Sequence, residues 1–89
     1  MPTVAFTANL RALVDCPTRT VEGQTVRAAL DAVFAEFPRL RGYVVDERGV
    51  LREHMVVFLD GVPINDRSSQ SDVTTPASMI YVMQALSGG

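Results

Sequence analysis

The chain has 89 residues, and at roughly 150 residues per domain this length predicts a single domain over residues 1–89. Hydrophobic residues make up 47% of the sequence and charged residues 20%, a balance that favours a globular fold over disorder. The formal net charge of -2 argues against nucleic-acid binding through phosphate contacts. A single cysteine and a single histidine argue against a disulfide, an iron–sulfur cluster or a zinc site. No apolar run is long enough to cross a membrane, so we expect a cytoplasmic protein without a metal or other cofactor of its own.

The first part of the chain is predicted to form two strands. Apolar residues alternate with smaller or more polar ones over Thr3–Leu10, which is typical of a half-buried strand. Asp15–Pro17 has the composition of a turn, and Arg19–Glu22 is predicted to be the return strand of a hairpin.

A helix is predicted over Val26–Phe37. Its apolar residues recur at intervals of three and one, which places them on one face of a helix. Thr25 is predicted to cap the first turn through its hydroxyl group, and Pro38 to end the helix.

The second half of the chain is predicted to return to strands and turns. In chain order these are a strand at Gly42–Val45, a turn at Asp46–Gly49, a strand at Met55–Leu59, a polar loop at Arg67–Asp72 and a strand at Met79–Leu86. The whole pattern predicts an α+β fold, with a mixed four- to five-stranded sheet and one main helix packed on one face.

The strands at Met55–Leu59 and Met79–Leu86 are apolar on both faces, although one helix can cover only one face of a sheet. An exposed apolar face is typical of a partner site, and we interpret the second face in this way. Cover by a loop or by a second copy of the chain is the alternative, so the protein alone is expected to be a monomer or a weak homodimer.

The sequence ends in Ser87, Gly88 and Gly89, directly after the last predicted strand. Because glycine has no Cβ atom, a diglycine tail can pass through a narrow channel and present its carboxylate to another enzyme. That carboxylate becomes reactive once it is adenylated, because a nucleophile can then replace the AMP. A frayed terminus without a function is the alternative interpretation.

A resemblance to a known family runs through nearly the whole chain. It is carried by Val21–Val26, Pro38–Leu40, Gly49–Arg52, Val57–Gly61 and Ile80–Gly89. In these stretches the chain resembles the MoaD/ThiS family, the β-grasp sulfur carriers that are related to ubiquitin. Only the terminal diglycine is closely tied to function, and the other stretches mainly report the fold.

The resemblance implies that an adenylyltransferase related to ubiquitin-activating enzymes uses ATP to adenylate Gly89. A sulfur donor would then convert this group to a thiocarboxylate. A sulfur-accepting synthase would use it to make molybdopterin, the thiamine thiazole, cysteine or a thiolated tRNA base. The chain would be a carrier and not an enzyme, with Gly89 holding the sulfur and Gly88 giving the tail its freedom.

Strand parity indicates which residues would dock the partner enzymes. They are Phe58, Tyr81 and Met83, with Leu86 at the root of the tail. The chain departs from the family pattern at Asp60-Gly61, at Thr75–Ser78 and at Gln84, where the family often has Asn-Gly, Gly-Asp and proline. The pathway stays open for this reason, because partner enzymes recognise the surface around the tail.

Two other functions share parts of this pattern. A ubiquitin-like modifier would use the same adenylation but would be conjugated through Gly89 to lysines of target proteins. A non-catalytic β-grasp adaptor would use only the apolar face, with an inert tail. An independent enzyme is the weakest alternative, because the sequence shows no paired nucleophile and base.

The remaining polar residues are interpreted as structural. Cys16 is expected to be a turn residue and not a sulfur relay, and His54 an ordinary surface histidine. The carboxylates Asp60, Asp66 and Asp72 are expected to form turns. All 8 basic residues are arginine, so the chain offers no lysine to another modifier. The arginines in the middle of the chain alternate with carboxylates, which predicts a solvated surface of mixed charge.

Overall fold

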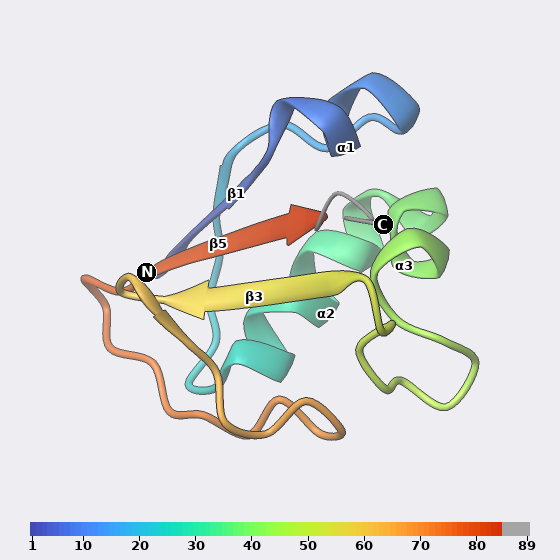
Figure 1. Ribbon diagram of the computed structural model, residues 1–89. Helices are drawn as coiled ribbons and strands as arrows, with labels where there is room; N and C mark the ends of the chain where they lie inside the picture. The colour runs from blue at the N-terminus through green and yellow to red at the C-terminus, as the bar shows by residue number, and fades with distance from the viewer. Residues whose placement is uncertain (85–89) are drawn as a thin grey trace.

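A five-stranded sheet forms one layer of the protein, and α2 lies behind it in Figure 1. The computed structural model describes residues 1–84. In spatial order the strands are β2, β1, β5, β3 and β4. Their bounds are Thr3–Phe6 for β1, Arg19–Thr20 for β2, Met55–Leu59 for β3, Val62–Pro63 for β4 and Met79–Gln84 for β5.

The two central strands, β1 and β5, run parallel, and every other neighbouring pair is antiparallel. This arrangement pairs the first strand, β1, with the last strand, β5. The centre of the sheet therefore forms only when these two distant segments of the chain come together. The mixed sheet confirms the α+β fold with four to five strands. It also confirms the predicted hairpin, although β2 is limited to Arg19–Thr20.

The main helix, α2 (Val26–Glu36), begins and ends close to the predicted positions. The Thr25 hydroxyl accepts a hydrogen bond from the N–H of Ala28 at 3.1 Å, which confirms the predicted cap. Phe37 is the C-cap residue, and Pro38 prevents the helix from continuing.

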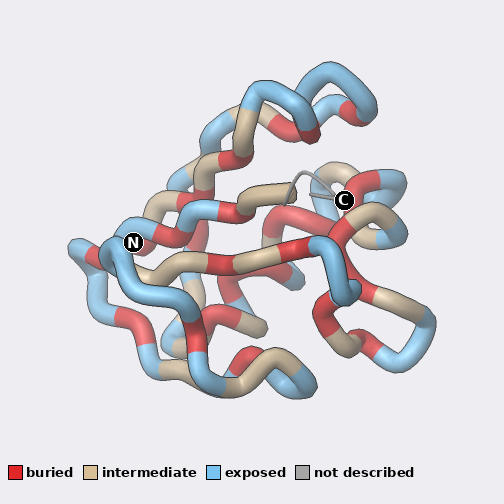
Figure 2. The backbone as a smooth tube through the Cα atoms, in the orientation of Figure 1, coloured by how far each residue is buried: buried red, intermediate tan, exposed pale blue. Residues whose placement is uncertain are grey.

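The core lies between α2 and the inner side of the sheet (Figure 2). The apolar stripe of α2 supplies buried residues that include Leu30 and Val33, and these face the buried side chains of the central strands. The fully buried sheet residues are Val4, Met55, Val57, Ile80 and Val82. Burial of an aliphatic side chain of this kind stabilises the fold by about 1.5–3 kcal/mol each.

The strand predicted over Thr3–Leu10 is wrong after Phe6, because α1 (Ala8–Leu13) follows it. The N–H of Thr7 makes a last bond to the sheet, to the carbonyl of Val82 at 3.2 Å. Alanine, leucine and arginine then favour a helix. Leu10 fits the strand pattern by coincidence, since its burial comes from one face of α1.

The strand predicted at Gly42–Val45 is also wrong, because these residues continue a third helix, α3 (Pro38–Val44), as far as Val44. Pro38 ends α2 and begins α3, since proline is favoured in the first turn of a helix. Leu40 and Val44, spaced by four residues, are both fully buried, as the helical period requires. The protein therefore has more helix than the one main helix that the sequence predicts.

The turn between β3 and β4 is made by Asp60 and Gly61, which both have positive φ angles, 51° and 84°. Two such residues form the type I′ turns that join antiparallel strands. The carboxylate of Asp60 also accepts the N–H of Met79 at 2.8 Å, and the N–H of Asp60 donates to the carbonyl of Met79 at 2.9 Å. Asp60 therefore fixes the start of β5 against the end of β3.

The long connection from β4 to β5 is held by two more carboxylates. Asp66 accepts the N–H of Ser69 at 3.0 Å and the hydroxyl of Ser71 at 2.6 Å. Asp72 accepts the N–H groups of Asn65 and Asp66. These bonds confirm the expectation that the carboxylates form turns.

In residues 1–84, no helix has the length and apolar character needed to span a membrane.

Candidate docking face and tail attachment site

The side of the sheet opposite α2 carries an apolar surface, which we call the outer face. It is formed by Ala5, Val56, Phe58, Tyr81 and Met83. Side chains alternate across a strand, so the residues between these ones point into the core. The alternation is visible in the burial pattern of β5, where Ile80 and Val82 are buried and Tyr81 is 39% exposed.

The register between β3 and β5 brings the predicted docking residues together. Phe58 lies directly opposite Tyr81, and Val56 lies directly opposite Met83. Residues opposite each other in an antiparallel pair lie on the same face, with Cβ atoms about 5 Å apart. The parallel pairing with β1 adds Ala5 beside Tyr81. Phe58, Tyr81 and Met83 therefore belong to one continuous surface, and their role in docking stays a prediction.

Val56 was not among the predicted docking residues, although it lies between Met55 and Val57 of the same strand. It shares the parity of Phe58, so the signal was present in the sequence. Leu86, Ser87, Gly88 and Gly89 fall outside the residues that the structure describes, and their predicted roles are not tested by it.

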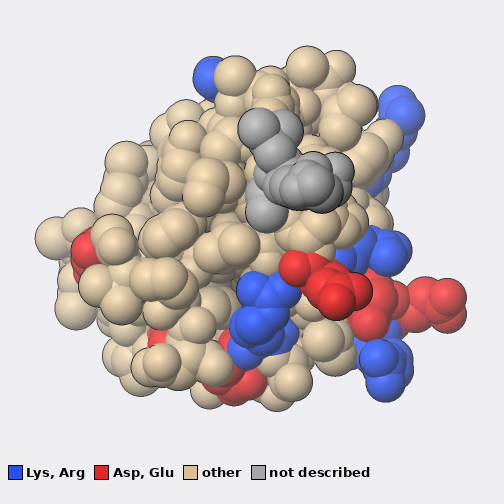
Figure 3. All heavy atoms as spheres, in the orientation of Figure 1, with Lys and Arg blue, Asp and Glu red and all other residues tan. Residues whose placement is uncertain are grey.

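The outer face is largely uncharged, as Figure 3 shows for the surface over β1 and β5. Charged side chains gather instead beside the loop that leads from α3 to β3 (Figure 3). An uncharged apolar area with a charged edge has the composition of a protein-binding surface, in which apolar residues occupy the centre and polar residues the rim.

The end of β5 is the point from which the chain continues toward the diglycine. Gln84, the last residue of β5, lies opposite Met55, the first residue of β3. The exposed residues Arg52 and His54 therefore lie beside this end of the sheet. On the opposite side, the bond from Thr7 to β5 places the start of α1 against the same end.

Arginine side chains tie together the loop that precedes β3. The guanidinium of Arg52 donates to the carbonyl of Gly42 at 2.7 Å, and that of Arg67 donates to the carbonyl of Arg52 at 2.8 Å. Arg48 lies 3.4 Å from Asp46 in an exposed ion pair. Hydrogen bonds from the N–H groups of Val50 and Arg48, with the nearby Arg48 charge, hold the pKa of Asp46 below its ordinary value. This loop has the mixed charge that the sequence predicted.

Cys16 is buried, with 2% of its surface exposed. Burial raises the pKa of its thiol, and the effect of Asp15 in the same direction is opposed by Arg11. A protonated, buried thiol is a poor nucleophile, so the environment of Cys16 gives no support to a sulfur relay. Residues 1–84 contain no group of three or more histidine, cysteine or acidic side chains that could hold a metal ion.

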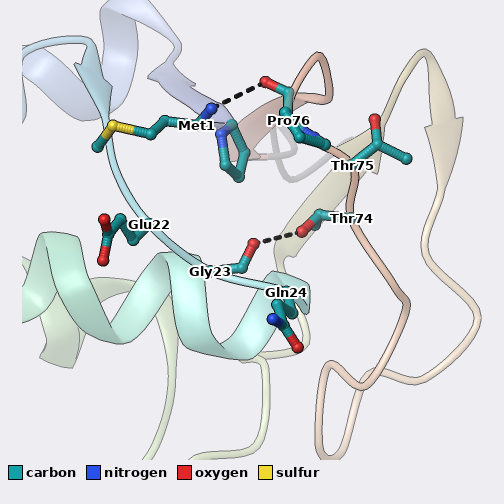
Figure 4. Close-up of a pocket in the computed structure, with 8 residues that line it drawn as sticks. Met1, Glu22, Gly23, Gln24, Thr74, Thr75 and Pro76 are labelled. Carbon is teal, nitrogen blue, oxygen red and sulfur yellow. Dashed lines mark hydrogen bonds between the residues drawn. The ribbon is translucent and has the colours of Figure 1, made fainter.

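A hollow of about 580 Å³ lies at the other end of the sheet, beside the start of β1 (Figure 4). The N-terminal amine of Met1 donates to the carbonyl of Pro76 at 3.2 Å, and the hydroxyl of Thr74 donates to the carbonyl of Gly23 at 2.6 Å. These bonds join the segment before α2 to the segment before β5. We interpret the hollow as a result of this crossing and not as a binding site.

Solved structures of similar fold match nearly the whole chain. SAMP1 from Haloferax volcanii superposes with a TM-score of 0.79 at 25% sequence identity, over 99% of this chain and 98% of that one. A chain in the Amycolatopsis orientalis BexX/CysO complex gives 0.83 at 18% identity, over 100% of both chains. CysO from Mycobacterium tuberculosis gives 0.80 at 13% identity, over 97% of this chain and 100% of that one.

These superpositions confirm the resemblance to the ubiquitin-like β-grasp proteins of the MoaD/ThiS type. The three matches cover 97% to 100% of this chain, so they extend over the whole five-stranded sheet. No protein-family model matches the sequence, and no curated relative was found.

Proposed function

We propose that this protein is a ubiquitin-like sulfur carrier whose terminal Gly89 is adenylated by a partner enzyme and then converted to a thiocarboxylate. The chain itself is a cosubstrate, and the partner supplies the ATP-binding site. The observation that carries the proposal is the position of the outer face. This face extends along β5, and β5 is the strand that precedes Ser87-Gly88-Gly89 in the sequence.

The geometry supports a single surface that binds the partner enzyme and also brings the tail close to it. A partner that covers Phe58, Tyr81 and Met83 also lies beside Gln84, where the described part of β5 ends. Binding at the outer face therefore brings the partner close to the start of the tail. A tail of small residues then needs no further contact with the body of the protein to enter an active site.

The chemistry requires little from the chain beyond a free carboxyl group. The carboxylate oxygen attacks the α-phosphate of ATP, and pyrophosphate leaves. A sulfur nucleophile then forms a C–S bond with the acyl carbon, and AMP leaves. We place both steps in partner enzymes of the ubiquitin-activating type, with a separate sulfur donor and a sulfur-accepting synthase.

A second function uses the same activated group. The similarity to SAMP1, a protein described as a small archaeal modifier, favours conjugation of Gly89 to lysines of target proteins. The two functions differ only in the nucleophile that accepts the acyl group. An adaptor with an inert tail would require the outer face alone.

Reconstitution tests the proposal. The purified chain is incubated with the host adenylyltransferase, ATP and sulfide, and the C-terminal peptide is analysed by mass spectrometry. We expect sulfur on Gly89 and none on a variant that lacks Gly88 and Gly89. Formation of the adenylate without sulfur transfer, together with protein adducts in cell extract, would support the modifier instead. An intact carboxylate with the active enzyme would support the adaptor.

A further inference from the structure

We propose that Met79 and Met83 form an oxidation site on the side of the sheet that carries the outer face, where a peroxide converts their thioethers to sulfoxides and blocks docking of a partner enzyme. The inference rests on the proposed function, in which a partner covers this face. It adds a reversible control of docking, since methionine sulfoxide is reduced back to methionine by dedicated reductases.

The two methionines belong to one row of side chains on β5. The row consists of Met79, Tyr81 and Met83, which alternate with the core residues of the strand. Each is two residues from the next, so all three side chains point to the same side of the sheet. The two methionines lie about 13 Å apart along the strand, with Tyr81 midway between them. Two of the chain's 4 methionines therefore flank the residue that lies opposite Phe58.

The sulfur-containing residues differ in their access to solvent. Met79 is 48% exposed and Met83 is partly exposed, whereas Met55 is 0% and Cys16 is 2% exposed. Met1 is also exposed, but it lines the hollow in Figure 4 at the start of β1. A peroxide from solution therefore reaches Met79 and Met83 while the protein is folded, and it does not reach the sulfur atoms of the core.

The modification is a two-electron oxidation of sulfur. A lone pair of the thioether sulfur attacks one oxygen of hydrogen peroxide, so that an S–O bond forms and the O–O bond breaks. The second peroxide oxygen leaves with both protons as one molecule of water. The sulfur is oxidised and the peroxide is reduced, and the step needs no other reactant.

The neighbours of the two methionines cannot satisfy the new oxygen atoms. Met83 lies opposite Val56, whose side chain has no hydrogen-bond donor. The Asp60 carboxylate, which accepts the N–H of Met79 at 2.8 Å, is itself only an acceptor when it is ionised. In the free chain, water bonds to the sulfoxide oxygens. A partner that covers the face removes this water, and an unpaired buried acceptor then weakens binding.

The first measurement uses the chain alone. The folded protein is treated with hydrogen peroxide, and fragmentation mass spectrometry follows the oxidation of each methionine. We expect Met79 and Met83 to react at least about tenfold faster than Met55, and the three rates to converge in urea. Because the modified side chains lie outside the core, the oxidised protein should keep a cooperative thermal unfolding transition.

The second measurement is binding to the host adenylyltransferase by titration calorimetry, with peroxide removed before the enzyme is added. Oxidation should raise the Kd of the wild type by at least about tenfold, and methionine sulfoxide reductases should restore it. The double variant Met79→Leu/Met83→Leu, which conserves side-chain volume, should keep its Kd after peroxide. Adding Val73→Met to this variant places a methionine at an exposed position outside the outer face, and the protein should stay insensitive.

Three results would overturn the inference. Oxidation of Met55 as fast as Met79 and Met83 in the folded protein would remove its selectivity. An unchanged Kd for the oxidised wild type would show that the sulfoxides do not block docking. An equal loss of affinity in the double variant would assign the effect to another residue.

The reduced wild-type chain separates this inference from the proposed function. If the reduced chain binds the enzyme but is not adenylated, the proposed function fails, and the comparison of reduced and oxidised protein still decides the inference. If the reduced chain does not bind at all, both fail together.

Discussion

Phe58 on β3 lies directly opposite Tyr81 on β5, on the side of the sheet that α2 does not cover. The pair lies near the centre of the outer face, with Ala5 on β1 beside Tyr81. Val57, Ile80 and Val82, which are neighbours of the pair along the two strands, are fully buried and anchor this part of the sheet in the core. A surface of this kind is preorganised for a partner, since its side chains lose little freedom on binding.

Replacement of Phe58 or Tyr81 by serine is expected to weaken docking of the adenylyltransferase. Loss of a central apolar contact costs about 1–3 kcal/mol of binding, which corresponds to a rise of about fivefold to about 150-fold in the KM of the adenylyltransferase for this chain. The kcat should change little, because the tail is intact. Steady-state adenylation at varied concentrations of the chain measures both quantities.

Val73→Ser is the matched control for this prediction. Val73 is apolar and 74% exposed, but it lies outside the outer face, in an isolated bridge to Thr25. We expect the KM of the adenylyltransferase for this variant to stay within about twofold of its KM for the wild-type chain, as is usual for substitutions away from an interface centre. An equal rise in KM for Val73→Ser would show that exposed apolar area in general, and not the outer face, determines binding of the adenylyltransferase.

Gly23→Ala is expected to destabilise the fold by about 1–3 kcal/mol, as overpacking usually does. A Cβ atom at this position would lie 2.6 Å from the backbone nitrogen of Ala29, so α2 would have to move. Gly42→Ala is the control, since no atom lies within 4 Å of the added Cβ and the residue is inside α3.

Gly42→Ala should be neutral or should stabilise the protein by up to about 1 kcal/mol, because alanine favours a helix. Urea unfolding of both variants compares the two free energies of unfolding. Equal stability of Gly23→Ala and Gly42→Ala would contradict the close packing of Gly23 against α2.

Acid should weaken the connection between β4 and β5. Hydrogen bonds from the Ser71 hydroxyl and from the N–H of Ser69 lower the pKa of Asp66 below its ordinary value of 3.8. A carboxyl group with a lowered pKa stabilises the folded state above the unfolded pKa, and this contribution disappears as the pH falls through the folded pKa. The loss is therefore expected below about pH 4.

The measurement is the thermal unfolding temperature of the wild type and Asp66→Asn between about pH 5 and pH 2. The variant should be less stable at the upper pH, and the difference should shrink as the wild type is protonated. A difference that stays constant over this range would contradict the assigned role of the carboxylate.

Cys16→Ala should leave sulfur transfer to Gly89 unchanged. The thiol is buried, and its removal creates only a small cavity, so we expect a loss of stability of about 1 kcal/mol. The measurement is the rate of thiocarboxylate formation for the wild type and Cys16→Ala, with the reconstituted enzyme and below the unfolding temperature of both proteins. A rate reduced by tenfold or more in a folded Cys16→Ala protein would make the thiol a relay.

The sequence pattern predicted the elements whose burial follows a single period. The apolar stripe of α2 follows the helical period and the core residues of β3 alternate, so both elements were located within one residue. The last strand begins at Met79 as predicted, and its predicted end at Leu86 lies outside the residues that the structure describes. The same reasoning explains the outer face, because Phe58, Tyr81 and Met83 differ in parity from the buried residues Val57, Ile80 and Val82.

The short helices were missed for physical reasons. In α1 only Leu10 is buried, so six residues carry no helical period that can be told from a strand. In α3 a proline was interpreted as the end of helical structure, although it also begins a new helix. The position of the arginines around the end of β5 depends on long-range contacts, and no local pattern reports it.

The central claim is that Gly89 carries sulfur, and the most direct test is fragmentation mass spectrometry of the C-terminal peptide from the protein purified from its native host. Replacement of one oxygen by sulfur nearly matches the mass of one methionine oxidation, and the chain has 4 methionines, so the shift must be assigned to a residue. We predict a thiocarboxylate on Gly89. A carboxylate that persists after addition of the host adenylyltransferase, ATP and sulfide would contradict the account.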